Sequence, residues 1–246
     1  MKKFLATLLF FCLFLSASFS QTQLRMGIRG GINLATYHYS FSPSLPTNST
    51  FNQPGNATLS TVGIPLEVSF GNSFALQAEF NFIQKGVKSH TEAKIQGGSL
   101  VIDSRTTVNW VEIPILAKFR FGSHQGFGGG LFVGPSIGYG INGHSQFSFT
   151  SSAPITGGLP NSSSDDRKLD FKNDRHSRVD LALNLGAEIN FDGFFLDTRY
   201  QLGLVDMQTD KIVSSTSSIS ARTRGIALTV GYRLPIILGT EKAAKH

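Results

Sequence analysis

Cysteine is almost absent from this chain. Cys12 is the only one among 246 residues, and it lies in an N-terminal apolar run, so the rest of the chain has no thiol for a disulfide, a metal ligand or a nucleophile. No later run reaches the roughly 18 consecutive apolar residues of a helical span, which excludes a bundle of membrane-spanning helices. Charged residues amount to only 15%. The cations are scattered, which argues against a nucleic-acid partner.

Residues 1–20 have the organisation of a secretory signal peptide. Lys2 and Lys3 form a basic start, residues 4–15 are apolar, and Ser18-Phe19-Ser20 is a small-x-small cleavage site. The apolar run is shorter than the roughly 20 residues that a membrane anchor needs. We therefore expect Sec-type export of the chain.

The most informative feature of the remaining chain is alternation. From Val179 to Phe191, apolar side chains occupy every second position, with mainly polar or small residues between them. Successive side chains of a strand point to opposite faces, so this segment predicts a two-faced strand, long enough to cross a bilayer when tilted. Eight segments follow the pattern: residues 24–37, 59–70, 74–87, 105–121, 127–147, 179–191, 194–207 and 222–234.

The connections between these predicted strands alternate in length. The tight ones are Gly71-Asn72-Ser73, 122–126 and Asp192-Gly193, and the longer ones are 40–58, 89–104, 150–177 and 208–221. Outer-membrane barrels have short periplasmic turns and longer external loops. Asp192-Gly193 is the strongest hairpin signal, because both residues tolerate the positive φ of a type I′ turn. It places Phe191 opposite Phe194 and Glu188 opposite Asp197.

The polar face of the predicted strands carries six acids and six bases among small residues. They are Arg29, Glu67, Glu79, Lys85, Glu112, Lys118, Arg120, Asp180, Glu188, Asp197, Arg199 and Arg233. One strand contributes Gly128, Gly130, Gly134, Gly138 and Gly140. Glycines weaken a water-exposed strand face, but inside an eight-stranded barrel they make room for long charged side chains. We predict an all-β, eight-stranded antiparallel transmembrane β-barrel with a filled polar interior.

Buried charges are costly unless they are paired, so we expect these twelve residues to form a connected structural network. Glu188 opposite Asp197 is a like-charge pair, and we expect one arginine to bridge the two carboxylates. Aromatic residues flank the tight turns, as in a membrane girdle: Phe70, Phe74, Phe121, Phe127, Phe191 and Phe194. The alternative is a secreted soluble β-barrel, which turns its apolar face inward around an apolar ligand.

Four stretches carry a family resemblance. They are Gly30-Gly31-Ile32-Asn33-Leu34, Leu76-Gln77-Ala78-Glu79-Phe80 with Gln84-Lys85-Gly86, the segment Val111 to Lys118 around Glu112-Ile113-Pro114, and Gly231-Tyr232-Arg233-Leu234. In these motifs the chain resembles the PorT-like outer-membrane β-barrels of Bacteroidota. The resemblance implies a barrel domain over residues 21–234, and one member of the family is linked to protein secretion across the outer membrane. Residues 235–246 depart from the family pattern, and we expect a periplasmic tail.

No motif in the sequence indicates catalysis, a cofactor or a metal ion. No two of the six histidines have the spacing of a zinc site. The acids of residues 165–174 alternate with bases, which favours a solvated loop over a calcium site. An outer-membrane enzyme at the outer rim is a further hypothesis; its candidate residues are His144, Ser145, Asp174 and His176. We expect no enzymatic activity, no cofactor and no metal.

These patterns together predict a Gram-negative cell-envelope protein that is anchored in outer-membrane lipid and inserted by the barrel assembly machinery. A wide diffusion pore is disfavoured, because an eight-stranded barrel is filled by its own side chains. External loops position variable contact residues. Residues 150–177 form the longest of the four long connections. We expect this loop to contact other envelope or secretion proteins.

Gel migration distinguishes the membrane barrel from the soluble alternative. We expect the unboiled protein to migrate faster in SDS than the boiled protein, because a closed transmembrane barrel stays folded in detergent. The soluble alternative predicts instead no such shift and recovery of the protein in the aqueous phase after detergent partitioning.

Overall fold

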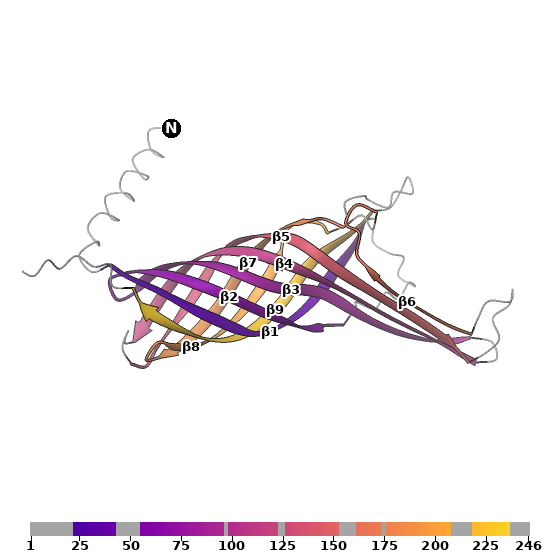
Figure 1. Ribbon diagram of the computed structural model, residues 1–246, viewed down its shortest axis with the longest axis horizontal. Helices are drawn as coiled ribbons and strands as arrows, with labels where there is room; N and C mark the ends of the chain where they lie inside the picture. The colour runs from indigo at the N-terminus through magenta and orange to yellow at the C-terminus, as the bar shows by residue number, and fades with distance from the viewer. Residues whose placement is uncertain are drawn as a thin grey trace, which may run out of the picture.

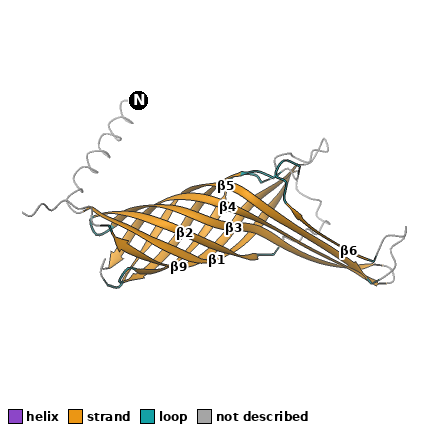
Figure 2. Ribbon diagram, viewed as in Figure 1, coloured by secondary structure: helices purple, strands orange, loops and turns teal. Residues whose placement is uncertain are grey.

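The computed structural model describes residues 22–42, 55–95, 98–122, 126–152, 161–173, 176–207 and 218–236. The strands are β1 (Thr22–Ser42), β2 (Ala57–Phe70), β3 (Phe74–Ile95), β4 (Gly98–Gly122), β5 (Gly128–Ser151), β6 (Ser162–Lys168), β7 (Val179–Phe191), β8 (Phe194–Gly203) and β9 (Ser218–Pro235). Figure 2 shows strands and loops throughout these ranges. No helix of the described residues is long and apolar enough to cross a membrane. The predicted signal peptide and residues 237–246 lie outside the described residues.

Eight of the strands close into a ring. Antiparallel neighbours follow each other as β1, β2, β3, β4, β5, β7, β8 and β9, and β9 pairs back onto β1. The ninth strand, β6, lies outside the ring and pairs with the far end of β5. The predicted eight-stranded antiparallel β-barrel is therefore confirmed, and β6 is an addition that the alternation did not predict.

Tight turns lie together at one end of the barrel, the left end in Figure 1, which we call the turn end. Asp192 and Gly193 have φ values of 46° and 85°, the positive sign that a type I′ turn requires at both central residues. The register places Phe191 opposite Phe194 and Glu188 opposite Asp197, as expected.

At the other end, β3, β4 and β5 continue beyond the ring, and β6 adds a fourth strand to them. Residues 89–104, expected to be a link, instead form a hairpin in which β3 runs to Ile95 and β4 starts at Gly98. The expected loop 150–177 contains β6. We call residues 88–95, 98–105 and 144–151 together with β6 the flap. Each strand rises about 3.3 Å per residue, so the flap extends about 25 Å from the barrel, toward the right in Figure 1.

A β-bulge marks the place where the flap leaves the barrel. Trp110 pairs with Gly140 but Asn109 pairs with Asn142, which leaves Ile141 as an extra residue on β5. A bulge bends and twists the bulged strand. Beyond it, the inward positions of β5 change from even to odd numbers, so the alternation predicted for residues 127–147 is interrupted.

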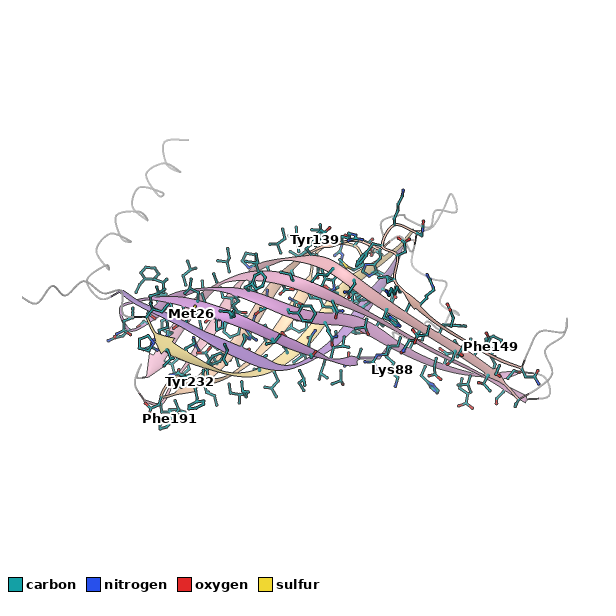
Figure 3. All side chains as sticks on the ribbon, in the orientation of Figure 1. Met26, Lys88, Tyr139, Phe149, Phe191 and Tyr232 are labelled. Atoms are coloured by element: carbon teal, nitrogen blue, oxygen red, sulfur yellow. The ribbon has the colours of Figure 1, made fainter. Side chains whose placement is uncertain are left out.

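Apolar side chains cover the outside of the barrel, whereas polar and charged ones fill the inside. Along β7, Leu181, Leu183 and Leu185 are exposed while Asp180 and Asn184 are buried. Figure 3 shows side chains projecting outward along the whole ring. The predicted filled polar interior is confirmed, and the soluble alternative, which places the apolar face inside, is wrong.

Aromatic rings surround the turn end. Phe74, Phe127, Phe191 and Phe194 are each more than half exposed, and the Phe194 ring centroid lies 4.6 Å from that of Tyr232. Figure 3 labels Phe191 and Tyr232 at this end. Outward aromatic rings at a barrel rim match the girdles that sit at a membrane interface.

An arginine on the outer face tests the orientation of the barrel. Leu185 lies midway along β7 and is 59% exposed. In lipid vesicles, Leu185→Arg is expected to lower the free energy of unfolding by about 2–4 kcal/mol, the cost of an arginine at the bilayer midplane. Urea unfolding measures this loss. Ser164→Arg on the exposed strand β6 is the control and should change stability by no more than about 0.5 kcal/mol; equal effects would contradict a lipid-facing Leu185.

Candidate functional site

The structure buries all twelve charged residues of the polar face inside the barrel. Their ion pairs divide them into three layers, which follow one another from the turn end toward the flap. The first layer holds Glu67, Lys118, Arg120, Glu188 and Arg233; the second holds Arg29, Glu79, Asp197 and Arg199; the third holds Lys85, Glu112 and Asp180. The formal charges of the three layers are +1, 0 and −1, so the twelve residues together are neutral.

In the first layer, two carboxylates share three cations. Lys118 Nζ lies 2.9 Å from Glu67 and 2.8 Å from Glu188. Arg233 also contacts both carboxylates, and Arg120 Nη1 lies 3.0 Å from Glu67 Oε1. Each carboxylate therefore accepts several charge-assisted hydrogen bonds, which offset its loss of hydration.

In the second layer, Glu79 lies between two arginines. Arg29 Nη1 and Arg199 Nη2 each approach a Glu79 carboxylate oxygen to 2.8 Å, and Asn81 donates a hydrogen bond of 2.7 Å to the same carboxylate. Asp197 pairs with the same two arginines, at 3.2 Å from Arg29 and 3.6 Å from Arg199. The layer joins β1, β3 and β8 across the lumen.

In the third layer, one lysine serves two acids. Lys85 Nζ lies 2.8 Å from Asp180 and also pairs with Glu112. Thr223 donates a hydrogen bond of 2.9 Å to Asp180, and Gln201 donates one of 2.7 Å to Glu112. The Thr223 hydroxyl and the Gln201 amide supplement the Lys85 ammonium, so each of the two carboxylates has a second polar partner.

The expected bridge between Glu188 and Asp197 is wrong in detail. Arg233 pairs with Glu188, whereas Arg29 and Arg199 pair with Asp197. The two acids are opposite in register but belong to different layers, because their side chains lean toward different neighbours along the barrel. No single arginine among the described residues bridges them.

The glycines of the lumen make room for inward-facing aromatic rings as well as for the long charged side chains expected from the sequence. A Cβ on Gly186 would lie 2.4 Å from the Phe132 ring, and one on Gly231 would lie 2.3 Å from the Phe195 ring. These rings lie beneath cations: Arg199 Cζ is 5.2 Å from the Phe132 centroid and Arg233 Cζ is 4.1 Å from the Phe195 centroid. Cation–π contact further stabilises guanidinium groups that have left water.

An apolar cluster caps the charged layers at the flap end. Its buried members are Tyr37, Ile83, Val108, Trp110, Phe171 and Met207. Cβ atoms on Gly140 and Gly138 would meet the rings of Phe171 and Trp110, at 2.8 and 3.4 Å, so these two glycines make room for the cap. The sequence does indicate this apolar cap, because Ile83, Val108 and Trp110 are apolar residues at positions of the polar face.

His176 joins the cap to the chain around it. Tyr37 Oη lies 2.9 Å from Nε2, and Nδ1 lies 3.0 Å from the Ser177 carbonyl. A carbonyl oxygen only accepts, so Nδ1 carries the proton and Nε2 accepts from the tyrosine hydroxyl. The imidazole ring also lies 5.8 Å from the Phe171 ring. His176 therefore fixes the segment that covers the lumen.

A cavity of about 250 Å³ lies above this cap, between the barrel mouth and the base of the flap. We call it the mouth cavity. One wall is a row across the four flap strands, and the other comes from the mouth and the cap. The lining residues are Val87, Thr106, Ser145 and Arg167 on the flap side, and Tyr37, Tyr39, Leu169, His176, Met207 and Ala221 opposite. The mixed lining can contact apolar groups and donate hydrogen bonds.

The residues of the enzyme hypothesis do not come together. Ser145 and His176 line the mouth cavity, whereas His144 is on the opposite face of β5 and pairs with Asp166. Asp174 lies outside the described residues. Within the described ranges, no group of three or more His, Cys, Asp or Glu side chains could hold a metal ion.

The family follows from comparison of the sequence with known protein families. Residues 19–208 match the family of the outer membrane protein beta-barrel domain, more than half of the chain. The chain belongs to this family. Membership places it in the outer membrane. From the usual asymmetry of outer-membrane barrels, we expect the turn end to face the periplasm and the flap to face outward.

Solved structures of bacterial surface and outer-membrane proteins match the chain over most of its length, at low identity and low TM-score. Ail of Yersinia pestis is 14% identical, with 85% of this chain and 98% of Ail covered and a TM-score of 0.38. Neisserial surface protein A is 11% identical, with 88% and 100% covered and a TM-score of 0.34. AlkL is 9% identical, with 87% and 93% covered and a TM-score of 0.33. No curated protein sequence matches significantly.

Removing the charge of Glu79 tests the energetic role of the second layer. Glu79→Gln keeps the shape of the side chain but leaves Arg29 and Arg199 with less compensating charge. We expect a loss of about 3–5 kcal/mol in the free energy of unfolding, the usual cost of breaking a buried ion pair. Urea unfolding, followed through the fluorescence of Trp110, the only tryptophan, measures it.

The matched control is Glu92→Gln on the exposed part of β3, which should change stability by no more than about 0.5 kcal/mol. If Glu79→Gln is as mild as the control, the lumen charges do not stabilise the barrel.

Proposed function

We propose that this member of the outer membrane protein beta-barrel domain family is a binding protein of the cell surface, which takes its ligand or partner in the mouth cavity and on the lumen-side face of the flap. The observation that carries the proposal is the mouth cavity of about 250 Å³, open above a sealed barrel. Its volume approaches the lower end of the range of small-molecule sites.

The filled lumen supports binding rather than passage. Three ion-paired layers and the apolar cap lie in series between the mouth cavity and the turn end. Between the second and third layers there is a cavity of only about 10 Å³, lined by Arg29, Asn81, Glu112 and Arg199 among others. Such a space accommodates about one water molecule. A solute would have to separate several buried ion pairs to pass.

The flap extends the binding surface beyond the cavity. Val87, Thr106 and Ser145 are paired in register at its base, and side chains two and four residues further along each strand share their face. On that face Ile102 and Phe149 are half-buried and Phe147 is exposed, with the two phenylalanine rings 6.4 Å apart. Figure 3 labels Phe149 far out on the flap. An amphipathic ligand or protein segment fits this surface.

The finer identity of the protein belongs to the same proposal. The PorT-like motifs of the sequence favour a secretion-associated role, in which an envelope or secretion protein is the partner that contacts the flap and the mouth. Under this proposal the chain reaches the membrane by Sec-type export, after cleavage of residues 1–20, and the barrel assembly machinery inserts it.

Photo-crosslinking in intact cells tests the proposed binding surface. A photoreactive phenylalanine analogue at Phe149 is expected to give a discrete adduct. Ala221→Trp should abolish this adduct while leaving heat-modifiable migration intact, because Ala221 is buried in the wall of the mouth cavity and the larger ring fills the space.

The control for this experiment is Ala187→Trp, on the lipid-facing side of β7, which should leave the adduct unchanged. An adduct at Phe149 that persists in Ala221→Trp would show that partner binding to the flap does not depend on the mouth cavity. If the chain that carries the analogue at Phe149 and no second substitution gives no adduct, the proposal is contradicted.

A further inference from the structure

The outer surface changes from apolar to polar where the flap begins. Gln84 Nε2 donates a hydrogen bond of 3.0 Å to Asn109 Oδ1, and Asn109 Nδ2 donates one to Asn142. The hydroxyl of Ser60 donates one of 2.9 Å to Gln84. These four residues, the amide ladder, cross four neighbouring strands. This row of three amides and one hydroxyl interrupts the apolar outer surface.

The strands that carry the ladder are apolar on its barrel side. Phe82 precedes Gln84 on the same face of β3, and Tyr139 and Ile141 precede Asn142 on β5; all three are exposed. On the flap side, outward positions carry charged and polar residues. The membrane surface therefore lies close to the ladder, since an outer-membrane barrel exposes its apolar band to lipid tails.

Two unpaired cations face each other just beyond the ladder. Lys88 on β3 is directly opposite Arg105 on β4, and both side chains are exposed. Like charges directly opposite each other destabilise a sheet. Neither cation forms an ion pair with a described residue, and the nearest acid in that row, Asp166, pairs with His144. Figure 3 labels Lys88 at the base of the flap, level with the barrel mouth.

A second pair of cations lies on another part of the ring, along one strand instead of across two. Arg222 and Arg224 occupy successive outward positions of β9, opposite His38 and Thr36 of β1, and neither forms an ion pair within the described part of the chain. The next outward residue toward the barrel, Ile226, is exposed. These arginines also lie immediately beyond the apolar band.

We propose that these two cation pairs, Lys88 with Arg105 and Arg222 with Arg224, bind the phosphate groups of lipid headgroups in the outer leaflet. A phosphate between Lys88 and Arg105 removes their mutual repulsion and accepts the paired N–H groups of the guanidinium. Cations near a membrane surface that carries anionic headgroups are attracted to it. The turn end carries aromatic rings at the corresponding outward positions, so the site belongs to one leaflet.

Thermal unfolding in vesicles of defined composition tests the proposal. The chain is reconstituted in phosphatidylcholine vesicles that contain either lipid A with both phosphates or enzymatically dephosphorylated lipid A. The midpoint is the temperature at which heat-modifiable migration is lost. We expect the phosphorylated lipid to raise this midpoint by about 4 °C, and Lys88→Gln with Arg105→Gln to remove about half of the rise.

The variants distinguish headgroup binding from a structural role. In dephosphorylated vesicles, the double glutamine variant should be at least as stable as the unaltered chain, because the like-charge repulsion is gone. The swap Lys88→Arg with Arg105→Lys should keep the rise, and so should Lys172→Gln, which removes a cation from the loop above the mouth.

Two results overturn the proposal. The first is an equal midpoint of the unaltered chain in both kinds of vesicle. The second is the same rise produced by inorganic phosphate in dephosphorylated vesicles, which would assign the cations to a soluble anion instead of a lipid.

Discussion

Charge balance among side chains buried in a closely packed lumen is the constraint on which the rest of this structure depends. Six acids and six bases occupy a lumen only wide enough for side chains, where an unpaired ion is several kcal/mol less stable than in water. Because both faces of a strand are fixed together, turning these charges inward necessarily turns Leu185, Phe80 and their neighbours outward. The lipid-facing surface and the sealed lumen are two results of one arrangement.

The bulge at Ile141 separates two regimes of the same sheet. On its barrel side the polar residues face in and the apolar residues face out, as lipid requires. On its flap side Ile102, Phe147 and Phe149 face the lumen side while Arg105 and Lys88 face outward. An extra residue on one strand bends the sheet, so the flap leaves the cylinder and its apolar face stands over the mouth.

The fold was largely predictable because its signals are local. Period-2 alternation and Asp192-Gly193 specify strands and a turn from neighbouring residues alone. β6 was not predictable, since Ser162–Lys168 is polar on both faces and becomes a strand only by pairing with β5. The partners of each charge were not predictable either: that Arg233 reaches Glu67 and Glu188 follows from the stagger of strands around the ring. The mouth cavity combines residues from seven separate described ranges of the chain, and no sequence motif indicates that they come together.

The seam between the first and last strands bears on how the molecule is made. β1 pairs with β9 from Arg25 opposite Pro235 to Ser42 opposite Ser218, so the edge of β1 stays open until nearly the whole polypeptide has been delivered. Arg233, near the end of β9, is also a counter-ion of Glu67 on β2 and Glu188 on β7. In a nascent or truncated chain without β9, Glu67 and Glu188 therefore lack the guanidinium of Arg233. Closing the barrel and completing the ion pairs of the first layer are thus one late step of biogenesis.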